Sequence, residues 1–483
     1  MAQQQEKGFH ERHRSQYLVD TDTTESQEDT ENECKPYFID LEGLRENEYE
    51  HLRSKGLMHP ETRDICLLRN VHYDYLSRAF QQQSQKRLPS SFVVLDASRP
   101  WMMYWTLHSC DLLNRLPPEE NLVGIVHTLE ACWQSVPLEF TDAQVRDDPY
   151  LSGITHMEGG GFAGGPGQMA HCATTYAAVL CLSIIATQPD IAAATTGDNN
   201  DDDDENVKDM SLDVPEDEEP SSRTLARKLL REKRLPLYAW FCKLQQPNGG
   251  YRMHFDGEID VRATYIVLCC ASLLQTYSSS SSTSSFLGSS RVLGYVKKCQ
   301  TMEGGFGGEP WAEAHGGYTF CAVAALELMK SLPSVDLAAL RGWLVRRQMA
   351  YEGGFQGRSN KLVDGCYSFW QGGALAIVSM QHKNNNPNSQ NHNVLLFQES
   401  LLQRYILLCA QDLNGGLRDK PSTPRDFYHS CYNLSGLSVS QHCGSLQYGH
   451  PTESSVAATH PVYNIRRERA AQMLNQDTSF VLQ

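Results

Sequence analysis

Histidines, aspartates, an arginine and a cysteine recur at a fixed distance after pairs of glycines in this chain. Among the residues ten to thirteen positions after the second glycine of a pair are His171, Asp260, Arg262, His315, Asp364, Cys366 and His429. Side chains of these types can bind a metal ion or hold an anion. If the glycine pairs mark a repeated structural unit, residues far apart in the sequence converge on one site.

The glycine pairs do mark a repeat. Five copies occur, at Gly160-Gly161, Gly249-Gly250, Gly304-Gly305, Gly353-Gly354 and Gly415-Gly416, at intervals of 89, 55, 49 and 62 residues. An apolar, periodic run precedes a pair, and a run of small and apolar residues such as 318–329 follows it after a loop. This pattern predicts a helix, a glycine turn, a loop and a second helix in each copy.

Low-complexity segments explain the longer intervals between copies. They are an acidic tract at 198–219, a serine run from Ser278 to Ser282 and an asparagine-rich stretch from Asn384 to Asn393. Without them the period is near fifty residues, and we predict surface loops or disorder for these segments. Strand signals are few, so the predicted class is all-α. Stacked helical pairs can form an open solenoid or a closed ring.

The net charge of −16 comes from two segments rather than from the predicted helices. Residues 198–219 carry −11 and residues 20–33 carry −7, which leaves the rest of the chain near +2. We therefore expect two solvated acidic tracts and no nucleic-acid partner. The longest nearly apolar stretch, 173–186, is short for a membrane span, and the polar N-terminus lacks a signal-peptide pattern. A cytoplasmic protein is expected, in agreement with fifteen irregularly spaced cysteines.

The residues at the repeated positions also have simpler interpretations. An aspartate before a helix is usually its N-cap, a cysteine here is usually core, and a histidine can be a satisfied buried group. Against this, Arg358 and Lys361 lie just before Asp364, and aromatic residues follow the polar positions closely. Cations at helix N-termini suit a diphosphate. An apolar tunnel beside such cations and a thiophilic metal would fit a long isoprenyl diphosphate and a thiol acceptor.

Four segments resemble one known family. The strings GRSNKLVDGCYSFWQ (357–371), EAHGGYTFCA (313–322), RDFYHSCYNLSGLS (425–438) and RPWMMYWTLHS (99–109) are similar to beta subunits of protein prenyltransferases, and specifically of the farnesyl enzymes. The similarity runs from about residue 101 to about residue 439. It implies a closed α/α barrel, or toroid, at 61–440 with an acidic insert at about 190–220. We expect a partly disordered polar segment at 1–60 and a tail at 441–483.

The resemblance implies a metal site and a diphosphate site. Asp364, Cys366 and His429 would bind one zinc ion per beta subunit, and Asp419 would help to hold magnesium. The catalytic residues that meet the diphosphate would be His315, Arg358, Lys361 and Tyr367.

The resemblance also implies the lipid and peptide contacts. The isoprenoid diphosphate would contact Arg262, Tyr265, His315, Gly316, Gly317, Tyr318, Cys321, Arg358, Ser359, Asn360, Lys361, Tyr367, Ser368, Phe369 and Trp370. The acceptor peptide and the selection of lipid length would involve Trp101, Trp105, Tyr428 and Tyr432. In the family, a tryptophan and a tyrosine close the tunnel of the farnesyl enzymes, and Trp101 and Tyr432 are at the matching positions.

The implied function is transfer of farnesyl from farnesyl diphosphate to the cysteine of a C-terminal CaaX motif, in an obligate heterodimer with an alpha subunit. A geranylgeranyltransferase beta subunit is the closest rival. A terpene cyclase is less favoured, because its Asp-x-Asp-Asp motif occurs only within the acidic run 201–204. A non-catalytic helical scaffold is the third alternative, and stoichiometric zinc would exclude it.

Overall fold

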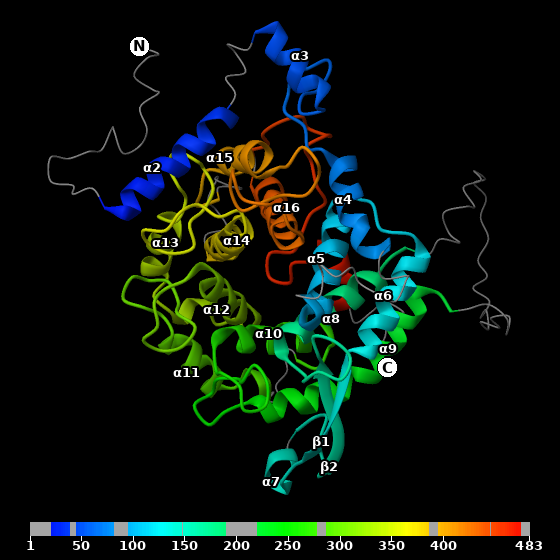
Figure 1. The fold of residues 1–483 in the computed structure, drawn as a ribbon. Coiled ribbons are helices and arrows are strands. Elements are labelled where there is room, and N and C mark those ends of the chain that lie inside the picture. The colour runs from blue at the N-terminus through cyan, green and yellow to red at the C-terminus, as the bar shows by residue number, and fades with distance from the viewer. Residues whose placement is uncertain are drawn as a thin grey trace, which may run out of the picture.

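Six inner helices form a closed ring in the computed structural model, which describes residues 21–38, 45–81, 95–146, 148–189, 220–277, 286–385, 395–444 and 446–474 (Figure 1). They are α5 (Arg99–Leu112), α8 (Cys172–Ala186), α10 (Val261–Leu273), α12 (Gly316–Leu328), α14 (Tyr367–Asn385) and α16 (Phe427–His442). Each packs against the next, and α16 returns to α5. The prediction of an all-α closed barrel is confirmed.

Outer helices pack around this ring. They are α4 (Arg69–Gln81), α6 (Glu119–Ala131), α9 (Ser222–Leu244), α11 (Ser290–Lys298), α13 (Leu337–Val345) and α15 (Glu399–Arg404), and α15 continues as a π-helix at Tyr405–Ala410. The inner helices α8 and α12 are buried on nearly all sides. This burial is expected for helices that are apolar around their whole circumference.

The glycine pairs form the turns that the sequence predicted. Gly249 and Gly304 have φ of +93° and +104°, values that favour glycine. A Cβ atom on Gly249 would lie 2.1 Å from the carbonyl oxygen of Arg291, and one on Gly304 would lie 2.1 Å from that of Ala339. Both carbonyls belong to the outer helix of the next repeat, so close backbone approach packs successive repeats together.

One copy of the repeat differs from this plan. Its glycine pair lies in an antiparallel hairpin of β1 (Trp133–Glu139) and β2 (His156–Phe162), with the short helix α7 (Asp142–Val145) between the strands. This hairpin was not predicted from the sequence. The hairpin replaces the turn between α6 and α8 and projects from one side of the ring (Figure 1).

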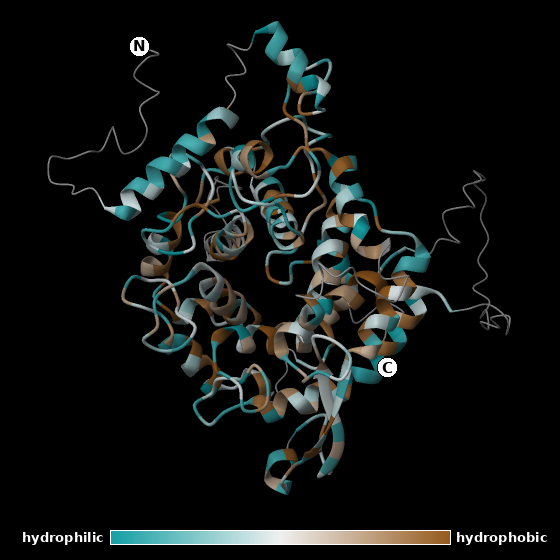
Figure 2. Ribbon diagram, viewed as in Figure 1, coloured by the Kyte–Doolittle hydropathy of each residue, from teal (hydrophilic) through white to brown (hydrophobic). Residues whose placement is uncertain are grey.

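The N-terminal acidic tract is partly folded. Residues 22–34 form α2 (Asp22–Cys34), and a second helix, α3 (Glu46–Ser54), follows. Both helices are largely hydrophilic (Figure 2). Even so, Gln27, Thr30, Glu31 and Cys34 are buried, and Gln27 Nε2 donates to Glu352 Oε1 at 2.7 Å. The expectation that the 20–33 tract is wholly solvated is therefore wrong, because one helical face contacts the barrel.

The C-terminal segment crosses the end of the ring where the inner helices finish. Residues 446–474 include α17 (Arg467–Leu474), and Ala457 N donates to the carbonyl of Leu112 at 2.9 Å. The hydroxyls of Tyr265 and Tyr104 donate to the carbonyls of Val462 and Asn464, each at 2.6 Å. Residues 446–474 of the region expected as a tail are thus packed against the barrel, through backbone hydrogen bonds that the sequence does not reveal.

Several predicted segments lie outside the described residues. They include the acidic insert at 190–219, the serine run at 278–282, the asparagine-rich stretch beyond Asn385, and residues 1–20 and 475–483. Among the residues that the structure does describe, no helix combines the length and apolar character needed to cross a bilayer. All fifteen cysteines are free, and all except Cys443 are buried.

Candidate active site

The inner helices begin at a common rim. Hydrogen bonds join the start of one inner helix to the loop of the next repeat: Cys172 N to Met253 O at 2.7 Å, Val261 N to Gly308 O at 2.9 Å, Gly316 N to Gly357 O at 2.8 Å and Gly365 N to Asp419 O at 2.8 Å. His171, Asp260 and His315 are side-chain N-caps of their helices. In these three repeats the polar residue ten positions after the second glycine is thus a helix cap, and these caps line one rim.

Three predicted metal ligands come together at this rim. One donor atom each from Asp364, Cys366 and His429 lies within 4.8 Å of the others. His429 Nε2 is 3.3 Å from Asp364 Oδ1, and the same oxygen accepts the Cys366 amide at 2.8 Å. Asp364 and Cys366 lie directly before α14, which begins at Tyr367, whereas His429 lies in the first turn of α16. Ring closure therefore assembles a site from positions more than sixty residues apart.

Asp426 orients the histidine of this set, a role that was not predicted from the sequence. Its carboxylate accepts the His429 amide at 2.6 Å and contacts His429 Nδ1 at 2.7 Å. The second contact orients the ring so that its other nitrogen, Nε2, faces Asp364. In metal sites a carboxylate often fixes a histidine ring in this way. Asp426 is ten residues after Gly416, the same spacing as Asp364 in its own repeat, so the repeat could have identified it.

The charged groups of the donor set and its surroundings shift the pKa values of its members. Burial would lower the pKa of His429, but the carboxylates of Asp364 and Asp426 outweigh burial and raise it to about 10. Burial would raise the pKa of Asp364, but His429 and the Cys366 amide lower it. Burial, with the Asp364 charge, raises the pKa of the Cys366 thiol well above its usual range. A cation bound beside this thiol would favour its ionised form.

Cationic and polar groups lie beside the three donors. His315 Nε2 is 3.0 Å from the Tyr367 hydroxyl, and Arg358 Nη1 donates to Glu313 Oε2 at 2.7 Å. Burial and the charge of Arg358 lower the pKa of His315. The side chain of Lys361 is exposed. These groups come from two adjacent repeats and share one stretch of the rim.

Asp419 lies next to the donor set. Its backbone carbonyl accepts the Gly365 amide, and its Oδ2 accepts from Lys420 Nζ at 2.7 Å. Its Oδ1 is buried with no hydrogen-bond partner among the described residues. Burial and the charge of Asp364 raise the pKa of Asp419, against the effect of Lys420. This oxygen can accept a cation.

Aromatic rings line the inner helices in a closed chain that we call the aromatic belt. Successive ring centroids are 4.3 to 5.8 Å apart around the belt. Its members, in order, are Trp101, Tyr176, Tyr265, Phe320, Trp370, Tyr432, Tyr428 and Trp105. The belt reaches the donor set, because the rings of Tyr428 and His429 are 5.0 Å apart. Trp101 and Tyr432, the predicted gate residues, both belong to the belt.

The other predicted contacts divide into two groups. At the rim, Gly316, Gly317, Tyr318, Ser359 and Asn360 lie in or beside the loops that carry His315 and Arg358. Arg262 lies over the Tyr318 ring, at 5.6 Å, and is held by Asp260 and Glu258. Cys321, Ser368 and Phe369 are buried in the wall. The structure therefore brings the polar residues together at the rim and places these three among the packed helices.

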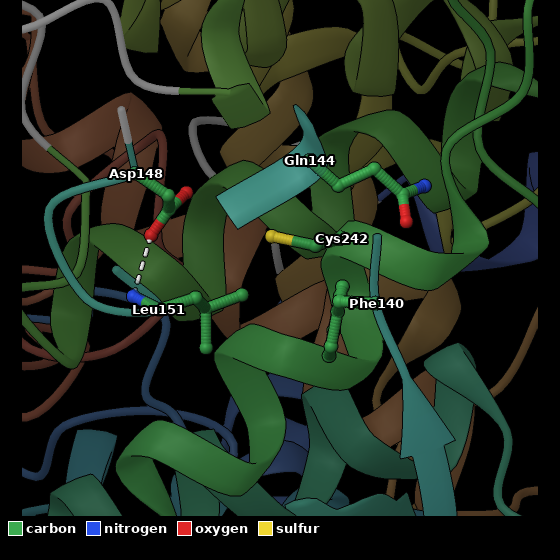
Figure 3. A pocket seen from close by; sticks show the side chains of 5 residues that line it. All are labelled: Phe140, Gln144, Asp148, Leu151 and Cys242. Atoms are coloured by element: carbon green, nitrogen blue, oxygen red, sulfur yellow. Dashed lines mark hydrogen bonds between the residues drawn. The ribbon is translucent and has the colours of Figure 1, made fainter. Parts of the chain in front are cut away.

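A separate small hollow lies between the α7 region and α9. Phe140, Gln144, Asp148, Leu151 and Cys242 line it (Figure 3). Asp148 Oδ1 accepts the amides of Tyr150 and Leu151, and its Oδ2 accepts the Tyr238 hydroxyl at 2.6 Å. Because the carboxylate is satisfied from within the fold, this hollow is structural.

The chain is similar to known prenyltransferases along most of its length. The family described as "Prenyltransferase alpha-alpha toroid domain" matches residues 67–199 and 222–465. The protein farnesyltransferase subunit beta of Pisum sativum is 34% identical, over 77% of this chain and 87% of its own. The subunit of the same name from Pyricularia oryzae is also 34% identical, over 94% of this chain and 80% of its own.

Geranylgeranyl enzymes match as well. The geranylgeranyl transferase type-1 subunit beta of Arabidopsis thaliana is 32% identical, over 42% of this chain and 51% of its own. A solved Candida albicans protein geranylgeranyltransferase-I, complexed with GGPP, is 19% identical with a TM-score of 0.57, over 85% of this chain and 100% of that one. The second likeness supports the fold alone. The chain therefore belongs to the prenyltransferase alpha-alpha toroid family and, within it, to the protein farnesyltransferase beta subunits.

Proposed function

We propose that this chain is the catalytic beta subunit of a heterodimeric protein farnesyltransferase. It would transfer farnesyl from farnesyl diphosphate to the cysteine thiol of a C-terminal CaaX motif. The observation that carries the proposal is the assembly of three metal donors beside a cationic rim and an aromatic belt.

The donor set fits zinc. A nitrogen, a sulfur and an oxygen donor within 4.8 Å suit a tetrahedral zinc site with a fourth position for substrate. Asp426 supports His429 from behind, as such sites require. Bound there, zinc would lower the pKa of the acceptor cysteine, whose thiol otherwise ionises near ~8.5.

The chain's own residues account for the rest of the reaction. The aromatic belt would bury the isoprenoid and exclude water from its reactive end. The thiolate sulfur forms a bond to C1 as the C1–oxygen bond breaks, and both electrons of that bond leave with the diphosphate. His315, Arg358, Lys361 and Tyr367 would stabilise the growing negative charge. The buried, unpartnered oxygen of Asp419 would help to hold a magnesium ion beside the diphosphate.

The choice of farnesyl rests on the aromatic belt. Trp101 contacts both Trp105 and Tyr176, with centroids at 5.5 and 5.8 Å, so an indole occupies the position proposed to receive the end of the lipid. A bulky wall there would reject a longer chain. Geranylgeranyl transfer remains the second candidate, because geranylgeranyl enzymes also match this chain.

The test is co-expression with an alpha subunit, followed by transfer assays on a CaaX peptide with farnesyl and geranylgeranyl diphosphate. We expect activity from the heterodimer, a preference for farnesyl and stimulation by Mg²⁺. The beta chain alone should be inactive. Equal use of both lipids would contradict the farnesyl assignment, and no transfer from a folded, zinc-loaded heterodimer would contradict the proposed function.

A further inference from the structure

Three cations at the rim, Arg262, Arg358 and Lys420, form ion pairs with carboxylates. Arg262 pairs with Asp260 and Glu258, and Lys420 pairs with Asp419, both within one repeat. The pair of Arg358 with Glu313 is different, because Glu313 belongs to the preceding repeat, 45 residues away. This ion pair therefore connects two repeats across the proposed diphosphate site.

Glu313 lies among the residues assigned to that site. It is two residues before His315, and the same two loops are also joined by Gly316 N to Gly357 O at 2.8 Å and by His315 with the Tyr367 hydroxyl at 3.0 Å. The nearby Glu303 uses its Oε2 to accept from Trp343 Nε1 at 3.1 Å and from the Ser359 hydroxyl at 3.4 Å, whereas the ion pair of Arg358 is with Glu313. Glu313 is thus the carboxylate that holds Arg358.

The pair is easily exchanged. The side chains of Arg358 and Glu313 are 38% and 54% exposed, and ion pairs this accessible contribute little to stability. A diphosphate offers Arg358 a stronger partner, because guanidinium groups bind phosphate oxygens in a forked geometry with charge-assisted hydrogen bonds. When a diphosphate takes Arg358, the carboxylate of Glu313 stays close to a second anion.

We propose that Glu313 is a positioning residue that competes with the diphosphate for Arg358. It holds the guanidinium at the rim, releases it when the substrate arrives and takes it back as inorganic diphosphate departs. The inference rests on the proposed function, which assigns the diphosphate to this part of the rim. Competition predicts that the natural glutamate weakens diphosphate binding and speeds product release.

The experiment compares the heterodimer carrying Glu313→Gln with wild type and with Glu309→Gln. Glu309 is an exposed glutamate four residues earlier on the same loop, so it controls for loss of one negative charge. Binding of inorganic diphosphate and of farnesyl diphosphate is measured by calorimetry. We expect Glu313→Gln to bind inorganic diphosphate about three- to tenfold tighter and Glu309→Gln to stay within about twofold.

Steady-state kinetics provide a second measurement. For Glu313→Gln the KM for farnesyl diphosphate should fall and product inhibition by inorganic diphosphate should strengthen, whereas kcat should not rise. If Glu313 only stabilises the loop, its loss would make the position of Arg358 less well defined and would weaken the binding of diphosphate. Weaker binding by Glu313→Gln would therefore overturn the proposal.

A double variant tests the role of Arg358. In an Arg358→Gln background, Glu313→Gln should give no further gain in affinity, because the group being competed for is gone. An equal gain in affinity in that background would mean that the charge of Glu313 repels the diphosphate without involving Arg358. That result would overturn the proposal. If wild type binds farnesyl diphosphate and Glu313→Gln is unchanged, only this inference fails. If wild type does not bind it, the proposed function fails as well.

Discussion

The two ends of the inner ring hold their charged groups in opposite ways. At the rim, Arg358 and Glu313 are half-exposed and connect neighbouring repeats. At the other end, Arg469 of α17 donates to both oxygens of Asp111, each at 2.6 Å, and the two side chains are only 6% and 1% exposed. Arg469 also donates to the carbonyl of Ile184 at 3.1 Å.

This difference separates charged groups that stabilise the fold from charged groups that can bind a ligand. A buried pair whose hydrogen bonds are all made within the fold has no group left for a ligand, and breaking it leaves an uncompensated charge. An accessible pair costs little to exchange and can pass its cation to a substrate. The closed end should therefore govern stability, and the rim should govern binding and turnover.

The largest expected effect is at the closed end. Asp111→Asn should destabilise the heterodimer by about 3–5 kcal/mol, because Arg469 would remain buried without a counter-charge. Denaturant unfolding measures this change. Glu46→Gln is the matched control, since Glu46 pairs with Arg63 at the surface, and it should cost less than about 1 kcal/mol. Equal losses of stability in the two variants would contradict the difference between the buried and the exposed ion pair.

Glu352 is a buried carboxyl that contacts α2 through Gln27. Burial raises its pKa to about 7, although the hydrogen bond from Gln27 opposes this, so the folded chain binds the proton more tightly than the unfolded chain. Stability should therefore be lost as pH rises from about 4.5 through about 7. Glu352→Gln should remove this loss and gain up to about 3 kcal/mol at pH 8, measured by unfolding across pH. The exposed Glu25→Gln should leave the pH profile unchanged, and an unaltered profile in Glu352→Gln would contradict the assignment.

Asp426 should act on metal affinity rather than on the fold. Asp426→Asn should weaken metal binding by about 10- to 100-fold, because His429 loses the partner that orients its ring. A competition titration with a chromogenic chelator measures this affinity. Asp336→Asn changes a cap carboxylate on α13, away from the donor set, and should leave metal affinity unchanged. A similar loss of metal affinity in both variants would mean that Asp426 acts only as a helix cap.

The smallest expected effect is on lipid choice. Trp101→Thr should raise the ratio of geranylgeranyl to farnesyl transfer by about tenfold or more. The extra isoprene unit could then be buried where the indole was, which contributes about 0.8 kcal/mol per CH₂. Single-turnover assays with both diphosphates give the ratio. The exposed Trp311→Asn should not alter it. An unchanged ratio in Trp101→Thr would place the length limit elsewhere in the belt.

The repeat made much of the fold predictable from the sequence. Gly249 and Gly304 identified turns because only glycine allows their backbone angles and close contacts. The hairpin at 133–162 and the packed segment after residue 446 were not predictable in the same way. Their positions depend on contacts with distant backbone, such as Leu112 with Ala457, that leave no local periodicity.

The candidate site shows a similar division. The spacing that singled out Asp364 and Cys366 reflects a real rim, and it also contained Asp426, whose role as a partner of His429 became evident only from geometry. Glu313 lies in the string EAHGGYTFCA (313–322) but was given no role there, because its significance comes from a cross-repeat contact with Arg358. A periodic sequence can show which residues lie at the same rim of the barrel, but not which of them contact one another.

The most direct test of the account is the zinc content of the purified heterodimer. Wild type and Cys431→Ala, which alters another buried cysteine of the ring, should each hold one zinc ion. Cys366→Ala should hold almost none and lose most turnover, yet still bind farnesyl diphosphate, because the cationic rim is a separate set of groups. Full zinc occupancy in Cys366→Ala, or none in wild type, would contradict the assignment of Asp364, Cys366 and His429 as the catalytic metal site.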